Sequence, residues 1–138
     1  MRKDSLSNME KTVYQKWLDR VKYDIDTADA MCSTGRYIYA VFMCQQALEK
    51  CLKALMPSKD IEIVPVHNIR RLAEIAGVIA EINPNDLIKI DFLSQFYLNA
   101  RYKEDIEELS SQITDEVAKE YLRFSKENIK WLTLKIRP

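Results

Sequence analysis

The sequence contains few residues that interrupt helices, with only 2 glycines and 4 prolines among its 138 residues. The long stretches between them repeat apolar residues every three or four positions, which is the spacing of one face of an α-helix. The stretch closest to a strand, Ile61–Val66, is interrupted by Pro65 and has no partner strand, so we expect an extended loop there. The predicted fold class is therefore all-α.

Metal-binding and common catalytic patterns are also missing. The chain has 1 histidine, and its 3 cysteines show no Cys-x-x-Cys spacing, whereas a structural zinc site needs about four nitrogen or sulfur ligands. There is no Walker loop, no Gly-x-Gly-x-x-Gly pattern and no nucleophile elbow. We therefore expect no metal, no cofactor and no serine-histidine-acid site, and we interpret the cysteines as small, reduced core residues.

Charge and hydropathy exclude further classes of function. Lys and Arg number 21, as do Asp and Glu, so the total charge does not indicate nucleic acid or a membrane surface, although it leaves a local basic patch open. No apolar run is long enough to span a bilayer, and the polar N-terminus has no signal-peptide core. A cytoplasmic protein without membrane contact is expected.

The length predicts one domain, residues 1–138. Ser7 and Glu10 have capping-box spacing, Pro57 is expected to stop a helix, and Asn83 before Pro84 is expected to start one. A row of Ala40, Ala47 and Ala54 predicts a close helix contact, either within the chain or between subunits. We expect about five helices in an up-down antiparallel bundle, at residues 7–34, 36–56, 68–76, 84–100 and 114–136, with 101–113 irregular.

Polar residues crowd one face of the helix predicted at 36–56. Gln46, Glu49, Lys50 and Lys53 share this face, close to Gln45. One interpretation is a solvated surface with a Glu49–Lys53 ion pair at the favourable spacing. The other is a polar cleft in which Lys50 and Lys53 bind phosphate, because ammonium groups on flexible stems suit that role.

Two further groups are candidates for a binding site. His67 stands where the helix at 68–76 begins, as a structural hydrogen-bonding residue or as a group that orients a ligand. Tyr97, Arg101 and Tyr102 gather at the end of the helix at 84–100. Arg101 can bind phosphate with two hydrogen bonds and the tyrosines can stack on a base. Alternatively, Arg101 caps its helix and the tyrosines pack.

Together these groups resemble the HEPN domain family. The resemblance is carried by Gly35, by "YIYAVFMCQQALEKCLKAL" at 37–55, by His67 and Leu72, and by "YLNARY" at 97–102. It spans most of the chain, although Lys103 replaces a proline that often follows the last motif. The resemblance implies a prokaryotic helical bundle, often a homodimer, that acts beside a separately encoded nucleotidyltransferase in a toxin–antitoxin-type pair.

Some members of the family are metal-independent RNases whose hallmark is Arg-x4–6-His. The residues at these distances before His67 are Glu62, Ile61 and Asp60, so the motif is absent and RNase activity of that kind is not predicted. The leading hypothesis is a non-catalytic module that binds nucleotide, RNA or a partner protein, with no catalytic residues. Its candidate nucleotide-binding residues are Gln46, Lys50, Lys53, His67, Tyr97, Arg101 and Tyr102. The alternatives are an RNase with a rearranged site using His67 and Arg101, and a purely structural dimerisation module.

Overall fold

The computed structural model describes residues 2–99 and 103–136, and the side chains of residues 13–96 and 107–136. These parts form six α-helices and one 3-10 helix, and no strand occurs among them. The all-α prediction is confirmed. The helices are α1 (Arg2–Ser33), α2 (Tyr37–Ser58), α3 (Ile69–Ile75), η1 (Ile79–Glu81), α4 (Pro84–Asn99), α5 (Lys103–Ser110) and α6 (Asp115–Lys135).

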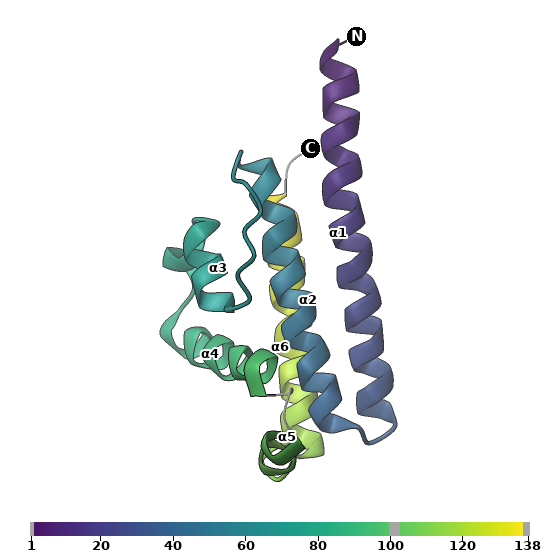
Figure 1. Ribbon diagram of the computed structural model, residues 1–138, viewed down its shortest axis with the longest axis vertical. Coiled ribbons are helices and arrows are strands. Elements are labelled where there is room, and N and C mark those ends of the chain that lie inside the picture. Colours follow the sequence, from purple (N-terminus) through teal and green to yellow (C-terminus); the bar gives the residue numbers. More distant parts are fainter. Residues whose placement is uncertain (1, 100–102, 137–138) are drawn as a thin grey trace.

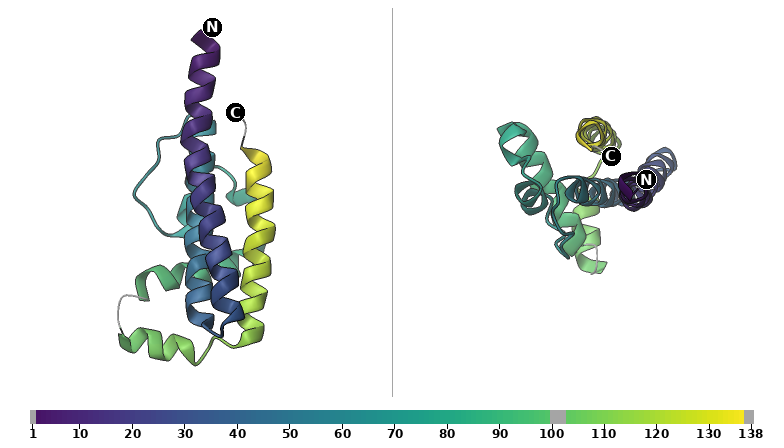
Figure 2. Two further views of the ribbon diagram at one scale, coloured as in Figure 1. Left: turned by 90° about the vertical axis from the view of Figure 1, so that its right-hand side faces the viewer. Right: turned by 90° about the horizontal axis from the view of Figure 1, so that it is seen from above.

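Three long helices run side by side and the shorter ones flank them (Figure 1). α1 and α2 form an antiparallel hairpin, and α6 lies beside both (Figure 2), running in the same direction as α2. The N-terminal part of α1 extends beyond the end of α2. α3 and α4 pack on the flank of α2, and α5 lies near the end of the bundle where α1 turns into α2.

The central helix α2 supplies most of the core because it contacts α1, α3, α4, α5 and α6. Ala40, Ala47 and Ala54 are fully buried within the single chain, so the alanine row is a seam inside the chain. All three cysteines are buried and free, as predicted. The buried apolar residues of α2 are Ala40, Val41, Cys44, Ala47, Leu48, Cys51, Leu52, Ala54, Leu55 and Met56.

Two turns follow their sequence signals. Gly35 has φ +80° between α1 and α2, a conformation that a side chain disfavours. The amide of Arg36 donates to the carbonyl of Met31 at 2.8 Å, which satisfies a free carbonyl at the end of α1. Asn83 caps α4, since its Oδ1 accepts from the amide of Asp86 at 2.9 Å, and Pro84 is the first residue of the helix.

Two predicted helix ends are wrong. α1 begins at Arg2, so Ser7 lies inside it; no glycine or proline occurs in residues 2–33, and a serine in mid-helix carries only a small penalty. Pro57 lies inside α2, which ends at Ser58, because the φ of proline is compatible with a helix and only one hydrogen bond is lost.

The segment at 101–113, predicted to be irregular, contains α5. The segment is mostly polar, so the prediction missed a short amphipathic helix, although most of its residues favour helices. Leu109 and, just beyond the helix, Ile113 are four residues apart and both buried, so packing against the bundle provides the stability that the polar sequence alone does not. No helix in the described part of the chain is long and apolar enough to cross a bilayer.

Candidate functional site

A buried polar cluster lies in the middle of α2. Gln45, Glu49 and Lys53 follow one another at four-residue intervals, so they lie on one face of the helix. Their exposed fractions are 0%, 5% and 6%. Buried charged groups are uncommon and require partners. These three residues and His67 are called the Glu49 cluster below.

Glu49 receives interactions from all three other members of the cluster. Lys53 Nζ donates to Glu49 Oε2 at 3.2 Å, and Gln45 Nε2 donates to Oε1 at 3.2 Å. His67 Nδ1 lies 3.2 Å from Oε1 and 3.1 Å from Oε2. Gln45 Nε2 also donates to the backbone carbonyl of His67 at 3.2 Å. The cluster therefore ties the loop before α3 to the centre of α2.

Lys50 lies on the adjacent part of α2 and pairs with α1. Its Nζ donates to Asp24 Oδ2, and the side chains are 23% and 6% exposed. Gln46 Nε2 donates to Gln45 Oε1 at 2.7 Å, which joins Gln46 to the Glu49 cluster. Lys50 and Gln46 are therefore the members of the polar face of α2 that are nearer to solvent.

Local structure beyond the cluster fixes His67. The next residue, Asn68, caps α3 by accepting from the amide of Arg71 at 3.0 Å. The amide of Ile69 donates to Ser94 Oγ on α4 at 3.1 Å. The backbone on the C-terminal side of His67 is thus held by α4, while its ring is held by Glu49. The His67 side chain is 40% exposed, so the ring stands at the surface in a fixed orientation.

The structure brings together four of the seven predicted site residues: Gln46, Lys50, Lys53 and His67. The Tyr97 side chain and residues 101 and 102 lie outside the described part of the chain. α4 is described as far as Asn99. Ser94 on this helix accepts a hydrogen bond from the amide of Ile69, two residues after His67. The described part of α4 is thus tied to the His67 loop through Ser94.

Sequence reasoning missed Asp24, the partner of Lys50. A signal was present, because Asp24 stands at helical spacing between Val21 and Ala28, both of which are buried. A carboxylate within an apolar stripe indicates a cation on the facing helix. Neither interpretation of the α2 polar face holds in its simple form. Most of the face is buried rather than solvated, and both of its lysines are paired with carboxylates.

The formal charges of the site balance. Lys50 and Lys53 face the carboxylates of Asp24 and Glu49, so an anion meets no excess positive charge from these residues. The Lys53 side chain is buried within the cluster at 7% exposed, whereas the Lys50 side chain is 23% exposed. Among the described residues, no group of three or more His, Cys, Asp or Glu side chains is arranged to hold a metal ion.

Comparison with known proteins agrees with this architecture. An archaeal HEPN homologue of known crystal structure is 24% identical, with a TM-score of 0.68, over 90% of this chain and 98% of that one. A protein from Thermus thermophilus is 22% identical, with a TM-score of 0.69, over 88% of this chain and 97% of that one. At these identities the likeness concerns the fold. No curated protein matches the chain.

The sequence also matches the family model described as the HEPN domain, over residues 14–136. The matched range includes the whole of α2, the Glu49 cluster and the cap of α3. The resemblance predicted from "QQALEKCLKAL" and the accompanying motifs is confirmed. Because this family model covers residues 14–136, the chain belongs to the HEPN domain family.

Proposed function

We propose that this protein is a non-catalytic HEPN module that binds nucleotide at the surface beside the Glu49 cluster. In this proposal it acts together with a separately encoded nucleotidyltransferase in a toxin–antitoxin-type pair. One observation carries the proposal: His67 is half-exposed yet held through Nδ1 by the buried carboxylate of Glu49. A ring fixed in this way can orient a ligand without the entropy loss of ordering a mobile side chain.

Lys50 is the phosphate contact in this proposal. It is the more exposed of the two lysines, and its neighbour Gln46 supplies an amide. A phosphate would compete with Asp24 for the ammonium group, so the affinity of the isolated chain is expected to be modest. Arg101 adds the bidentate phosphate contact, and Tyr97 or Tyr102 stacks on the base.

A non-catalytic role is supported by the partners of the single histidine. In this sequence no arginine precedes His67 with four to six residues between them, and the Nδ1 atom of the ring is engaged by Glu49. Positioning of a ligand is the role that this arrangement suits. A homodimer, as the family resemblance implies, would place two such surfaces in one assembly.

Calorimetric titration of the protein with ATP and with a short RNA tests the proposal. Lys50→Ala and Arg101→Ala are each expected to weaken binding about tenfold, which is about 1.4 kcal/mol. Lys22→Ala is the matched control, because Lys22 also pairs with an aspartate, Asp26, but is 78% exposed on α1. Absence of binding by the wild type at millimolar ligand would refute the nucleotide-binding role.

A second role, a purely structural dimerisation module, is favoured by one observation. Both lysines of the α2 polar face already have carboxylate partners within the chain. In this case Lys50→Ala would lower the stability of the fold and leave ligand and partner binding unchanged. Measuring unfolding and binding on the same variant separates the two roles.

A further inference from the structure

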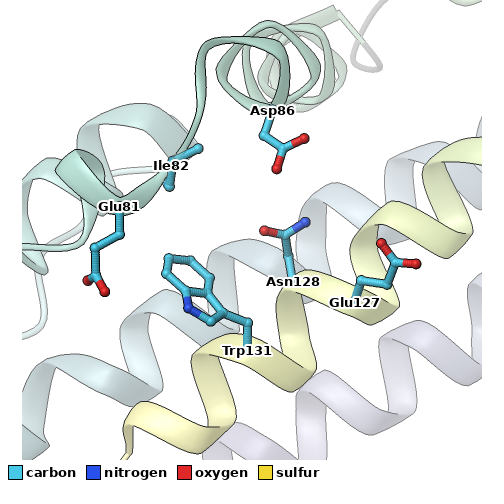
Figure 3. Close-up of a pocket in the computed structure, with 6 residues that line it drawn as sticks. All are labelled: Glu81, Ile82, Asp86, Glu127, Asn128 and Trp131. Atoms are coloured by element: carbon cyan, nitrogen blue, oxygen red, sulfur yellow. The ribbon is translucent and has the colours of Figure 1, made fainter.

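An open pocket lies between α6 and the segment that joins α3 to α4, on a different part of the bundle from the Glu49 cluster. Its volume is about 210 Å³. In Figure 3, Asp86 at the start of α4 and Asn128 on α6 point toward each other across the space, and the Trp131 indole forms one wall. The residues that line it are Glu81, Ile82, Asp86, Glu127, Asn128 and Trp131.

One wall of this pocket already carries a cation from the chain itself. Lys135 Nζ lies 5.0 Å from the centre of the Trp131 ring and 2.7 Å from Glu81 Oε1. An ammonium over an indole face is attracted by the electron density of the ring, and a carboxylate completes the site. The contact with Lys135 shows that the Trp131 face can hold a positive charge. The case for a cation therefore does not depend on the carboxylates alone.

A second lysine between an aromatic ring and a carboxylate lies nearer the N-terminus of α6. Lys89 Nζ lies 5.3 Å from the centre of the Phe124 ring and 3.2 Å from Glu120 Oε1. Two cations of the chain thus each pair an aromatic face with a carboxylate along the side of α6 that faces α4 and η1.

Two of the three carboxylates that line the pocket, those of Asp86 and Glu127, form no ion pair among the residues that the structure describes. The Asp86 carboxylate accepts from Asn83 Nδ2, the side chain of its own cap, at 3.2 Å. Among the ion pairs of the described residues, these three carboxylates meet one ammonium group, that of Lys135 at Glu81. The described side chains that line the pocket therefore carry an excess of negative charge.

We propose that this pocket binds an organic cation, a guanidinium or primary ammonium group, between the Trp131 face and the carboxylates of Glu127 and Asp86. The volume suits a group of the size of an arginine side chain. Lys135 competes with the ligand, because it covers the Trp131 face and neutralises Glu81. The cation belongs either to a small free molecule or to a side chain of a protein partner.

Fluorescence of Trp131 tests the proposal. The chain has 2 tryptophans, so Trp17→Phe leaves Trp131 as the single reporter. In this background the protein is titrated with butylguanidinium and with butylurea, which has nearly the same shape but no charge. A third titration uses N-acetylarginine amide as a probe of a protein side chain. Tighter binding of this amide than of butylguanidinium indicates a partner's arginine, and the reverse indicates a free small molecule.

Variants of the acidic wall provide the comparison. Butylguanidinium is expected to change the fluorescence with a dissociation constant near or below about 1 mM, and butylurea to bind at least about tenfold more weakly. Glu127→Gln is expected to weaken butylguanidinium about threefold, the effect of removing one exposed charge contact. Glu116→Gln, an exposed position on α6 that does not line the pocket, should leave binding unchanged. Lys135→Met should tighten it by uncovering Trp131.

Two results would overturn the proposal. One is binding of butylurea as tightly as butylguanidinium, because the charge would then be irrelevant. The other is no change in butylguanidinium affinity on Glu127→Gln. Circular dichroism of each variant confirms that the helices are retained, so that a loss of binding reports on the pocket.

Discussion

Removal of the Glu49 carboxylate is expected to destabilise the protein strongly, because Glu49→Ala leaves the ammonium of Lys53 buried without a counter-charge. The Lys53 side chain is 7% exposed, as is that of Glu49. Breaking a buried ion pair by removing one partner costs about 3–5 kcal/mol. Since a domain is stable by about 5–15 kcal/mol in total, the variant loses a large share of its stability.

Urea unfolding followed by circular dichroism measures this loss. The control is Glu74→Ala, because Glu74 pairs with Arg71 at 3.0 Å but is 43% exposed, so its removal should cost less than about 1 kcal/mol. A second variant, Glu49→Leu with Lys53→Met, removes both charges and should be more stable than Glu49→Ala, because no buried charge is left unpaired.

The reasoning would be refuted by a loss below about 1 kcal/mol for Glu49→Ala, the value typical of an exposed pair. A double variant less stable than Glu49→Ala would refute it as well. Either result would mean that Lys53 reaches water or another partner, and that the cluster does not hold the His67 loop through buried charge.

Four further predictions follow from the fold. Burial raises the pKa of Cys44 and Cys51 to about 12, so disulfide-exchange reagents at pH 8 should modify them far more slowly in the folded than in the urea-unfolded protein. Because the unfolded thiols lose their protons near pH 9.0, stability should fall as pH rises from about 9 toward 12. Asn83→Ala removes the α4 cap and should cost about 1 kcal/mol in urea unfolding. Gly35→Ala, at φ +80°, should lower the melting temperature, with about 1 kcal/mol lost.

The helices could be predicted because their signals are local. Long apolar stripes, the Gly35 turn and the Asn83 cap all act within a few residues, and they account for most of α1, α2, α4 and α6. The differences at α2 and α5 have separate causes. α5 and the end of α2 at Ser58 depend on packing or on hydrogen bonds that tolerate one missing donor, and neither is visible in a local pattern.

The sequence indicated which residues of α2 belong to the candidate site better than it indicated their interaction partners. The spacing of Glu49 and Lys53 indicated an ion pair, which the structure contains at 3.2 Å. The pairing of Lys50 with Asp24 on another helix was not predicted, because it depends on the register of α1 against α2. That register decides whether a lysine is free for phosphate. The pocket at Trp131 joins η1, α4 and α6 and had no sequence signal, since its members are separated by up to 50 residues (Glu81 to Trp131).

The most direct test of the proposed function is calorimetric titration of ATP into the wild type and into Lys50→Ala, with Lys22→Ala as the control. The nucleotide-binding account predicts binding by the wild type and by Lys22→Ala. It predicts binding about tenfold weaker in Lys50→Ala. Absence of heat at millimolar ATP, or equal affinity in the wild type and Lys50→Ala, would contradict the assignment of the nucleotide site to the surface beside the Glu49 cluster.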